Sequence, residues 1–552
     1  MNVDISTTRN SLDYRLLMQF RVHEILIVSS VYDAFKLQED GHLSEMLMSE
    51  FAAFNLFTTP RITRVSTAEH AFKKMEDYRY DLIITMAHIV DMNPYDFASR
   101  VKELFSDLPI IMLSSNKAEH NWLTKTSENL DAIDKIFYWY GDSAIFPAII
   151  KYVEDKKNAD RDILKGNTRA IIVVEDSPEF YSIFLPMFYK IVIKSVDELI
   201  RVEYTDELKL FRMYSRPKIL LCSTYEEGLE YFEKYYRQVL TVISDVRYPK
   251  DGKIDGAAGV KLLSKILDKY PSLPALLFSK EVHNEKIAAD IGAYFLDKNS
   301  NNLVKELKQH ILKHCGFGDL IFTTPDKKEV DRAENLESLQ RALQTVPLES
   351  IEYHAKRNHF SNWFANRGYF NLADQLKPMV YSDFDQETGK DLKTFLIEGI
   401  AAQRKALVED KVVVFNRDSY DPHIKYVRMG NGSIGGKARG LVFLVNYLKQ
   451  FSFREKFPDI NIDIPNFVVL STDLYDKFLE NNNILDKLPS CKTDDDIDKL
   501  YLSSTFTQSI RDDFRFYLKK NTQPLAVRSS SLLEDNYFEP FAGIYTTIMV
   551  PN

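Results

Sequence analysis

Residues 170–176 read AIIVVED, an apolar run that ends in two carboxylates. Four more apolar runs of strand length follow along the chain: KILLCS (218–223), VLTVISD (239–245), LPALLFS (273–279) and AYFLDK (293–298). Segments with helical spacing separate these runs. Short apolar runs that alternate with amphipathic helices are typical of parallel strands covered on both faces. Residues 168–315 are therefore predicted to form a doubly wound α/β domain with a parallel sheet.

The same order of elements precedes this domain. Residues 22–155 contain the apolar runs EILIVSS (24–30), DLIITM (81–86) and LPIIMLSS (108–115), again separated by helical patterns. Two consecutive segments of similar length and order indicate that one fold has been duplicated. The sequence thus predicts two tandem doubly wound domains.

The rest of the chain differs in pattern. Residues 1–21 form a short leader, and the charged residues 156–167 are predicted to be a solvated linker. Residues 316–410 have helical spacing without strand-like runs and are rich in Phe, Trp and Leu, which predicts a packed helical connector. Residues 411–552 begin with the strand-like KVVVF and end in a strand and a turn. We expect this last region to be part of a domain, and the chain to be a fragment of a longer protein.

Composition excludes several classes of protein. The 552 residues are enough for three to four domains of ~150 residues. A hydrophobic content of 45% excludes general disorder, and no apolar run approaches the ~18 residues of a membrane span. The net charge of -9 argues against non-specific nucleic-acid binding, and three distant cysteines form neither a disulfide framework nor a zinc site. We expect a cytoplasmic protein with no membrane or nucleic-acid partner.

Polar side chains end four of the five strands predicted in the second α/β domain. Glu175 and Asp176 follow the first run, and Asp245 ends the third. Ser279 ends the fourth run, and Lys298 ends the fifth. Carboxyl ends of parallel strands meet at one edge of a sheet, where three carboxylates suit Mg²⁺ and Asp245 would be a nucleophile that forms an acyl phosphate. Each residue alone is also compatible with a helix cap, a turn or a surface lysine; the five in this order favour the site.

These residues, in this order, closely resemble the receiver domain of two-component response regulators. The resemblance implies a flavodoxin-like sheet, Mg²⁺ bound by Glu175, Asp176 and Asp245, and phosphorylation of Asp245. It implies that Ser279 and Lys298 contact the phosphoryl group. The partner it implies is a sensor histidine kinase or a small phosphodonor.

The first α/β domain is similar but lacks this chemistry. Its first strand ends in Ser29 and Ser30 instead of an acidic pair, and Met86 stands at the phospho-acceptor position. The last run, IFYWY, offers no lysine, and neither Asp33 nor Asp91 stands at the required strand end. Without a nucleophile no acyl phosphate forms, so this domain is predicted to be a pseudo-receiver that serves dimerisation or docking. An unrelated small α/β domain is the alternative.

Glycine is concentrated in one stretch. Only 19 residues are glycine, and five of them fall in GNGSIGGKARG, residues 430–440. Asn431 and Ala438 break the Walker pattern, and the Rossmann acidic residue is missing. Glycines at this density let backbone amides approach an anion, and the KARGLVFLVNYL that follows predicts a helix N-terminus at the same place. The stretch therefore predicts a phosphate site with Lys437 as an added charge; a glycine-rich hairpin is the alternative.

A second element, PLAVRSSSLLED at 524–535, is an apolar strand followed by Arg528 and three serines, which suit phosphate oxygens. Together with FAGIYTTIMVPN at 541–552, the two elements resemble the nucleotide-binding domain of pyruvate phosphate dikinase and phosphoenolpyruvate synthase. Residues 359–378 resemble the connector that precedes this domain in some bacterial synthase-like proteins. The resemblance implies a partial ATP-grasp-like α+β domain whose ATP contacts are Gly435, Gly436, Lys437, Arg528 and Ser529.

Two hypotheses follow. In the first, the chain is a two-component signalling protein whose receiver is phosphorylated on Asp245 and is linked to an ATP-dependent phosphotransferase module. The swivelling and barrel domains of the dikinase family are not recognisable, so pyruvate or phosphoenolpyruvate would be reached only through further domains. In the second, the chain is a non-enzymatic, phosphorylation-responsive scaffold with a vestigial ATP-binding half-domain. A homodimer is compatible with both, whereas a DNA-binding regulator fits poorly because no basic recognition helix follows the receiver.

Overall fold

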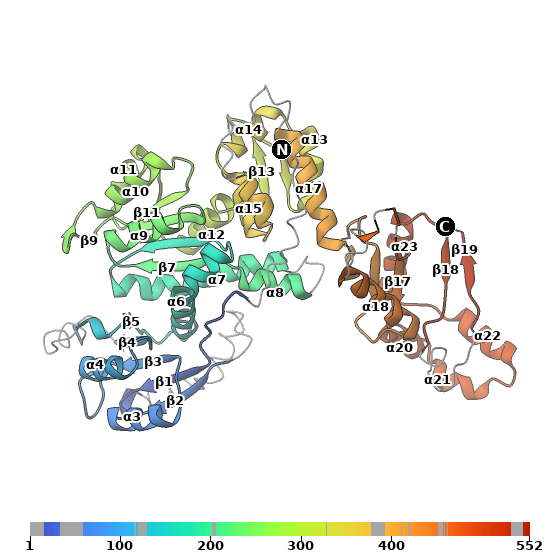
Figure 1. The fold of residues 1–552 in the computed structure, drawn as a ribbon, viewed down its shortest axis with the longest axis horizontal. Coiled ribbons are helices and arrows are strands. Elements are labelled where there is room, and N and C mark those ends of the chain that lie inside the picture. The colour runs from blue at the N-terminus through green and yellow to red at the C-terminus, as the bar shows by residue number, and fades with distance from the viewer. Residues whose placement is uncertain are drawn as a thin grey trace. The chain divides into compact units, whose positions relative to one another are not determined.

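The computed structural model describes most of the chain, in two compact units (Figure 1). Unit 1 comprises residues 1–201 and 210–396, and unit 2 comprises residues 202–209 and 397–552. The described residues are 16–33, 59–114, 118–119, 130–200, 206–326, 328–376, 392–409, 411–417, 420–450, 456–457, 459–460, 462–531 and 545–551.

The first sheet of unit 1 is parallel, with strand order β2-β1-β3-β4-β5. Its central strands are apolar and buried on both faces, as covered parallel strands require. The strands are β1 (Glu24–Val28), β2 (Arg61–Val65), β3 (Leu82–Met86), β4 (Ile110–Ser114) and β5 (Lys135–Tyr138). The described helices are α3 (Ala68–Asp77), α4 (Pro94–Leu104), η3 (Leu130–Ala132) and α6 (Ile145–Ala159).

The second sheet repeats this arrangement in the order β12-β11-β8-β6-β7, again parallel. The strands are β6 (Ala170–Val174), β7 (Lys218–Cys222), β8 (Val239–Asp245), β11 (Ala275–Ser279) and β12 (Tyr294–Asp297). The helices are α7 (Pro178–Ile200), α8 (Asp206–Tyr214), α9 (Tyr225–Tyr235), α10 (Ala258–Lys269), α11 (Asn284–Asp290) and α12 (Leu303–His314). Numbered within each domain, both orders are 2-1-3-4-5, the flavodoxin-like order. The predicted duplication of a doubly wound fold is confirmed.

A small hairpin follows β8, made of β9 (Tyr248–Lys250) and β10 (Lys253–Asp255). Its turn holds Asp251 and Gly252 at φ 52° and 72°. Two positive φ values in a two-residue turn match the twist of the flanking strands, which explains the Asp-Gly pair.

The prediction of a solvated linker at 156–167 is wrong. Helix α6 ends at Ala159 and continues directly into a π-helical turn, η4 (Asp160–Lys165). Asp162 is fully buried and forms a 2.7 Å ion pair with the buried Lys218 at the start of β7. The charge run looked solvated because its partners come from a distant part of the sequence; a buried charge is tolerated only when it is paired.

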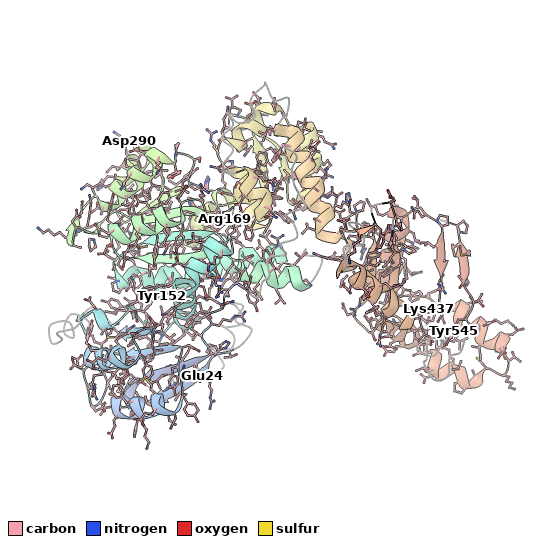
Figure 2. All side chains as sticks on the ribbon, in the orientation of Figure 1. Glu24, Tyr152, Arg169, Asp290, Lys437 and Tyr545 are labelled. Atoms are coloured by element: carbon pink, nitrogen blue, oxygen red, sulfur yellow. The ribbon has the colours of Figure 1, made fainter. Side chains whose placement is uncertain are left out.

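The two sheets share a hydrophobic core. Helix α6 lies against α7 and β7, and α7 lies against β5. Phe137 of β5 packs edge-on against Tyr152 of α6 at 6.0 Å and Tyr181 of α7 at 5.3 Å between ring centroids. Figure 2 labels Tyr152 within unit 1. One cluster of buried residues runs through both sheets, so the first domain is docked on the second within the chain.

The connector is helical except at its start. Strands β13 (Leu320–Thr323) and β14 (Glu329–Ala333) form an antiparallel hairpin, so the prediction of a region without strands is wrong there. These strands are too short to produce a recognisable pattern. The packed character is confirmed by Trp363, which is 1% exposed. The helices are α13 (Leu336–Thr345), α14 (Leu348–Ala355), α15 (His359–Asn366), α16 (Phe370–Leu376) and α17 (Leu392–Val408).

Unit 2 contains a three-stranded parallel sheet, β15-β16-β17, and a two-stranded antiparallel sheet, β18-β19. The strands are β15 (Val412–Val414), β16 (Tyr426–Met429), β17 (Phe467–Leu470), β18 (Leu525–Val527) and β19 (Ile548–Val550). The helices are α18 (Gly436–Gln450), α20 (Thr472–Asn481), α21 (Ile484–Lys487), η7 (Leu488–Ser490), α22 (Asp494–Ser503) and α23 (Gln508–Lys520). Residues 532–544, which hold parts of two sequence motifs, lie outside the described residues. Among the helices that the structure describes, none is long and apolar enough to cross a membrane.

Candidate functional site

The strand register of the second sheet brings the predicted site residues to one edge. Val174, the last residue of β6, is paired with Ser244, so Glu175 and Asp245 follow at the same level. Asp245 is paired with Phe278, and Ser279 with Asp297. Because these strands are parallel, the side chains after β6, β8, β11 and β12 all belong to the carboxyl edge.

Glu175, Asp176 and Asp245 form an acidic cluster. One oxygen from each carboxylate lies within 4.8 Å of the others, and among the described residues this is the one group of three potential metal ligands so placed. Burial, together with the neighbouring Asp245 charge, raises the pKa of Glu175 above its usual value, although Lys298 opposes the shift. Burial and Asp245 also raise the pKa of Asp176. The cluster therefore concentrates negative charge that a divalent cation would neutralise.

Lys298 bridges two members of the cluster. Its Nζ lies 2.5 Å from Glu175 Oε2 and 2.7 Å from Asp245 Oδ1. The ammonium also lies over the ring of Phe180, at 4.5 Å from the centroid. Lys298 is nearly buried, so the pairs are shielded from water and a single positive charge serves two carboxylates.

Ser279 is fixed by its own loop. Its Oγ accepts hydrogen bonds from Asn284 Nδ2 at 2.9 Å and from the Glu281 amide at 3.1 Å. The hydroxyl proton is not used by these two bonds and stays available to an acceptor at the edge. The structure thus brings together Glu175, Asp176, Asp245 and Lys298 and places Ser279 at the end of the adjacent strand.

Sequence reasoning missed Lys135. This residue starts β5 of the first domain, yet its Nζ donates a hydrogen bond to Ser223, directly after β7 of the second domain. Burial lowers the pKa of Lys135 to about 8, although the acidic Glu227 opposes the shift. The carboxylate of Asp176 also interacts electrostatically with Lys135. No local pattern could reveal this contact, because it depends on how α6 and α7 join the two sheets.

Among the residues that the structure describes, the corresponding edge of the first sheet carries no cluster of three carboxylates. Met86 ends β3 and is buried, and Ser29 and Ser30 follow β1. Asp91 accepts hydrogen bonds from the amides of Ala68 and Glu69 and thus caps helix α3. Asp91 thus has a structural role in this domain, and the pseudo-receiver stays a prediction.

The glycine stretch of unit 2 joins β16 to α18, so the helix predicted after it is confirmed. Its first half is bound by the start of α20. The Asp473 carboxylate accepts hydrogen bonds from the amides of Asn431 at 3.3 Å and Gly432 at 2.7 Å. A Cβ on Gly430 or Gly432 would collide with this region, at 2.1 Å from Ser471 Oγ and 2.6 Å from the Asp473 amide. These two glycines are required by close packing.

The second half of the stretch packs on the segment after β18. The amide of Gly436 donates to the Ser530 carbonyl at 3.1 Å, and the amide of Ala438 donates to Ser530 Oγ at 3.1 Å. A Cβ on Gly435 would lie 1.4 Å from the Ser530 carbonyl oxygen. The structure therefore brings GGKARGL and VRSSS together, with Ser530 as the contact that the sequence did not single out.

The other residues predicted for this site belong to the two segments that meet at this junction. Lys437 is in the first turn of α18, Arg528 directly follows β18, and Ser529 Oγ accepts the amide of Ser531 at 3.2 Å. Figure 2 labels Lys437 on unit 2. A helix N-terminus flanked by Lys437 and by an exposed Arg528 is suited to phosphate groups.

Comparison with known proteins supports the second assignment. Residues 431–552 match the family model of the pyruvate phosphate dikinase AMP/ATP-binding domain. The resemblance predicted from the two motifs is confirmed. No curated protein matches the chain.

Among solved structures, the chain is similar to a putative two-component system response regulator/GGDEF domain protein, at 16% identity over 52% of this chain and 98% of that one, with a TM-score of 0.23. It is also similar to the signal receiver domain of an HD domain-containing protein from Pseudomonas fluorescens Pf-5, at 17% identity over 26% of this chain and 94% of that one, with a TM-score of 0.21. Likeness at this level carries no inference about function. The flavodoxin-like fold of both domains rests on their strand order.

Proposed function

We propose that the second α/β domain is a phosphoryl-accepting receiver, with Asp245 as acceptor, linked to an ATP-binding module of the pyruvate phosphate dikinase type. The observation that carries the proposal is the edge of the second sheet. Three carboxylates lie within 4.8 Å of one another there, and Lys298 contacts both Glu175 and Asp245. This is a nucleophile with its charge partners already in position.

The chemistry requires a phosphodonor such as acetyl phosphate or a phosphohistidine. An oxygen of the Asp245 carboxylate attacks phosphorus, and an acyl phosphate bond forms. The bond from phosphorus to the donor breaks, and the donor leaves with the electron pair of that bond. Lys298 pairs with the charge on the transferred group, and the Ser279 hydroxyl donates to one of its oxygens. Mg²⁺ held by Glu175, Asp176 and Asp245 would neutralise phosphoryl charge.

The ATP-binding part of the proposal rests on unit 2. Lys437 and Arg528 would contact ATP phosphates, and Gly435, Gly436 and Ser529 would shape the loop around them. In the free chain Ser530 accepts hydrogen bonds from the loop amides of Gly436 and Ala438. These two bonds hold the loop beside the segment that carries Arg528 and Ser529, so both elements would contribute to one ATP site.

The receiver part is tested by incubating the full chain with acetyl phosphate and Mg²⁺ and weighing the intact protein. The wild-type chain should gain one phosphoryl group, and Asp245→Asn should gain none. Asp290→Asn is a matched control, because this exposed carboxylate ends α11 and precedes β12, whose opposite end leads to Lys298; Figure 2 labels Asp290. Equal labelling of Asp245→Asn and wild type would reject the assignment.

Measuring the ATP affinity of the full chain distinguishes the hypothesis of a regulated phosphotransferase from that of a scaffold. ATP affinity should fall at least about tenfold in Lys437→Ala and in Arg528→Ala, because each removes a charge-assisted contact. Lys499→Ala, an exposed lysine of α22, should leave the affinity unchanged. Failure of the wild-type chain to bind ATP would favour the scaffold.

A further inference from the structure

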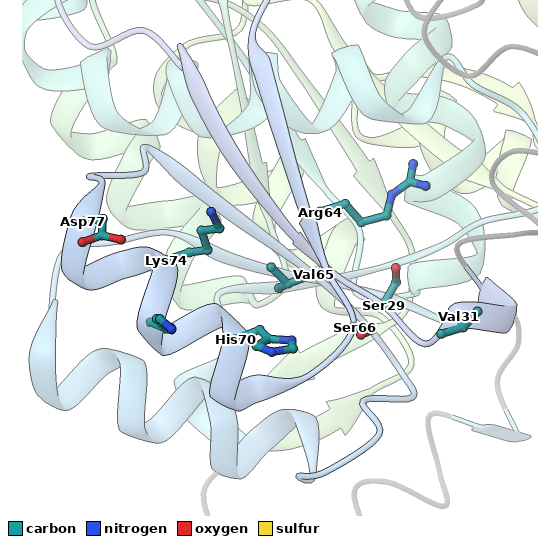
Figure 3. A pocket seen from close by; sticks show the side chains of 9 residues that line it. Ser29, Val31, Arg64, Val65, Ser66, His70, Lys74 and Asp77 are labelled. Atoms are coloured by element: carbon teal, nitrogen blue, oxygen red, sulfur yellow. The ribbon is translucent and has the colours of Figure 1, made fainter.

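A cavity of about 500 Å³ lies in the first domain, away from the acidic cluster. It is lined by the end of β1, by β2 and by helix α3 (Figure 3). Its volume is in the range of small-molecule sites. Among the described residues the first domain has no acidic cluster like that of the second, yet a cavity of ligand size lies beside β2, the edge strand of its sheet.

Two polar groups of this cavity lack a partner. Ser29 is 1% exposed, and its Oγ has no hydrogen-bond partner. The Nε of Arg64 is buried and also has none. Burial lowers the pKa of the Arg64 guanidinium, and the described residues give it no carboxylate partner. A buried hydroxyl and a partly buried cation are costly when they stay unpaired, so both fit a bound acceptor.

Most of the charged side chains that α3 contributes to the cavity are basic. His70, Lys73 and Lys74 line the cavity, and Asp77 is its one acidic residue. With Arg64, the lining of the cavity therefore contains three permanent positive charges and one negative charge. Val31 and Val65 supply apolar surface, and Ser66 supplies a second hydroxyl.

We infer that this cavity binds a small phosphate-bearing ligand, with Arg64 and Ser29 holding the phosphate and with Lys73 and Lys74 in the wall that α3 contributes. Arg offers several donors in a fixed plane that matches phosphate oxygens, and the Ser29 hydroxyl adds another donor. Asp77 would accept a hydrogen bond from a hydroxyl or amine elsewhere on the ligand. This binding needs neither phosphorylation of Asp245 nor ATP at unit 2, and it gives the first domain a sensing task of its own.

The test uses pyrophosphate as probe and lysine acetylation as a local readout on the full chain. EDTA is present, so that metal at the acidic cluster does not contribute. Mass spectrometry follows the acetylation rates of Lys73 and Lys74, with the exposed Lys286 of α11 as internal control. Pyrophosphate should slow acetylation of Lys73 and Lys74 severalfold and leave Lys286 unchanged. Unchanged rates, or equal slowing by sodium chloride at the same ionic strength, would overturn the inference.

Single-residue variants test whether pyrophosphate protects Lys73 and Lys74 by binding in this cavity. Arg64→Gln and Ser29→Ala should each raise the pyrophosphate concentration needed for protection, by about tenfold for Arg64→Gln, since a hydrogen bond to a charged group is lost. Lys437→Ala should have no effect on protection of Lys73 and Lys74. Wild-type protection in a folded Arg64→Gln would contradict the assignment. If circular dichroism shows that Arg64→Gln does not fold, Ser29→Ala decides the outcome by the same criterion.

Discussion

At the scale of single residues, strand ends were the most informative feature of the sequence. Glu175, Asp176, Asp245, Ser279 and Lys298 could be placed at one sheet edge because parallel strands deliver their carboxyl ends together. The contacts of Lys135, Asp473 and Ser530 could not be predicted. Each of them pairs with a group far away in the sequence, and one residue alone gives no sign of such a partner.

Two glycines of the stretch 430–440 provide a matched test of the contact between this stretch and Ser530 in unit 2. Gly435→Ala would put a Cβ 1.4 Å from the Ser530 carbonyl oxygen, whereas a Cβ on Gly440 meets nothing within 4 Å. We expect Gly435→Ala to separate the two motifs and abolish ATP binding. Gly440→Ala should keep ATP binding and stabilise α18 by ~1 kcal/mol, the usual difference between Gly and Ala in a helix.

Calorimetric titration with ATP and thermal unfolding of both variants check this expectation. Tight ATP binding by Gly435→Ala would mean that the contact between the glycine stretch and Ser530 is not needed for the site.

At the scale of elements, the apolar central strands of both parallel sheets were predicted. The edge strand β2 was missed because its two arginines interrupt the apolar pattern, and the other errors also involve charged or short segments. The run from α6 into η4 looked like a linker because its acidic and basic residues suggested water, yet Asp162 is buried with Lys218. The hairpin β13–β14 was missed because two strands of four and five residues carry too few alternations.

Four histidines lie where the receiver meets the connector. His310 and His314 are on α12, and His354 and His359 belong to α14 and α15. The Thr323 amide donates to His354 Nε2, so the proton of that ring is on Nδ1 and is donated to His359 Nδ1 at 2.8 Å. Asn358 Nδ2 also donates to Ser272 Oγ of the receiver at 2.9 Å. All four imidazole rings are therefore packed as neutral groups where the second α/β domain meets the helical connector.

Burial lowers the pKa of His310 and His359 to about 3 and that of His314 and His354 to about 4. Nearby positive charges on Lys313 and Arg357 act in the same direction. The unfolded chain takes up protons on these four rings near pH 6.5 while the folded chain does not, so the histidines lower the stability as the pH drops below that value. We expect a loss of a few kcal/mol in total between pH 7 and pH 5.

Urea unfolding of the full chain at these two pH values measures the loss. His354→Gln should reduce the pH dependence, whereas His283→Gln, an exposed histidine before α11, should leave it unchanged. An equal pH dependence in wild type and His354→Gln would contradict this view of the interface.

At the scale of the whole molecule, two tandem domains were predictable from repeated patterns, but their shared core was not. The pattern of each domain accounts for its own sheet, whereas the packing of β5, α6 and α7 involves faces from both domains. Phe137 is fully buried in this core. Phe137→Ala should cost about 3–5 kcal/mol and destabilise both domains together.

Hydrogen exchange of Phe137→Ala tests this cooperativity. Amides of β1 and β3 and amides of β6 and β8 should lose protection to the same extent, and Val90→Ala, at a side chain 65% exposed, should change neither set. Loss of protection confined to the first sheet would show that the two domains unfold independently.

The central claim is that Asp245 carries the phosphoryl group. The most direct measurement is reduction of the acetyl phosphate-treated full chain with borohydride, followed by peptide mass spectrometry, because an acyl phosphate on aspartate is reduced to homoserine at the modified position. The account predicts homoserine at position 245, only with Mg²⁺ present and much less of it in Lys298→Ala. Homoserine at Asp176 or at any other position, with an unmodified Asp245, would contradict it.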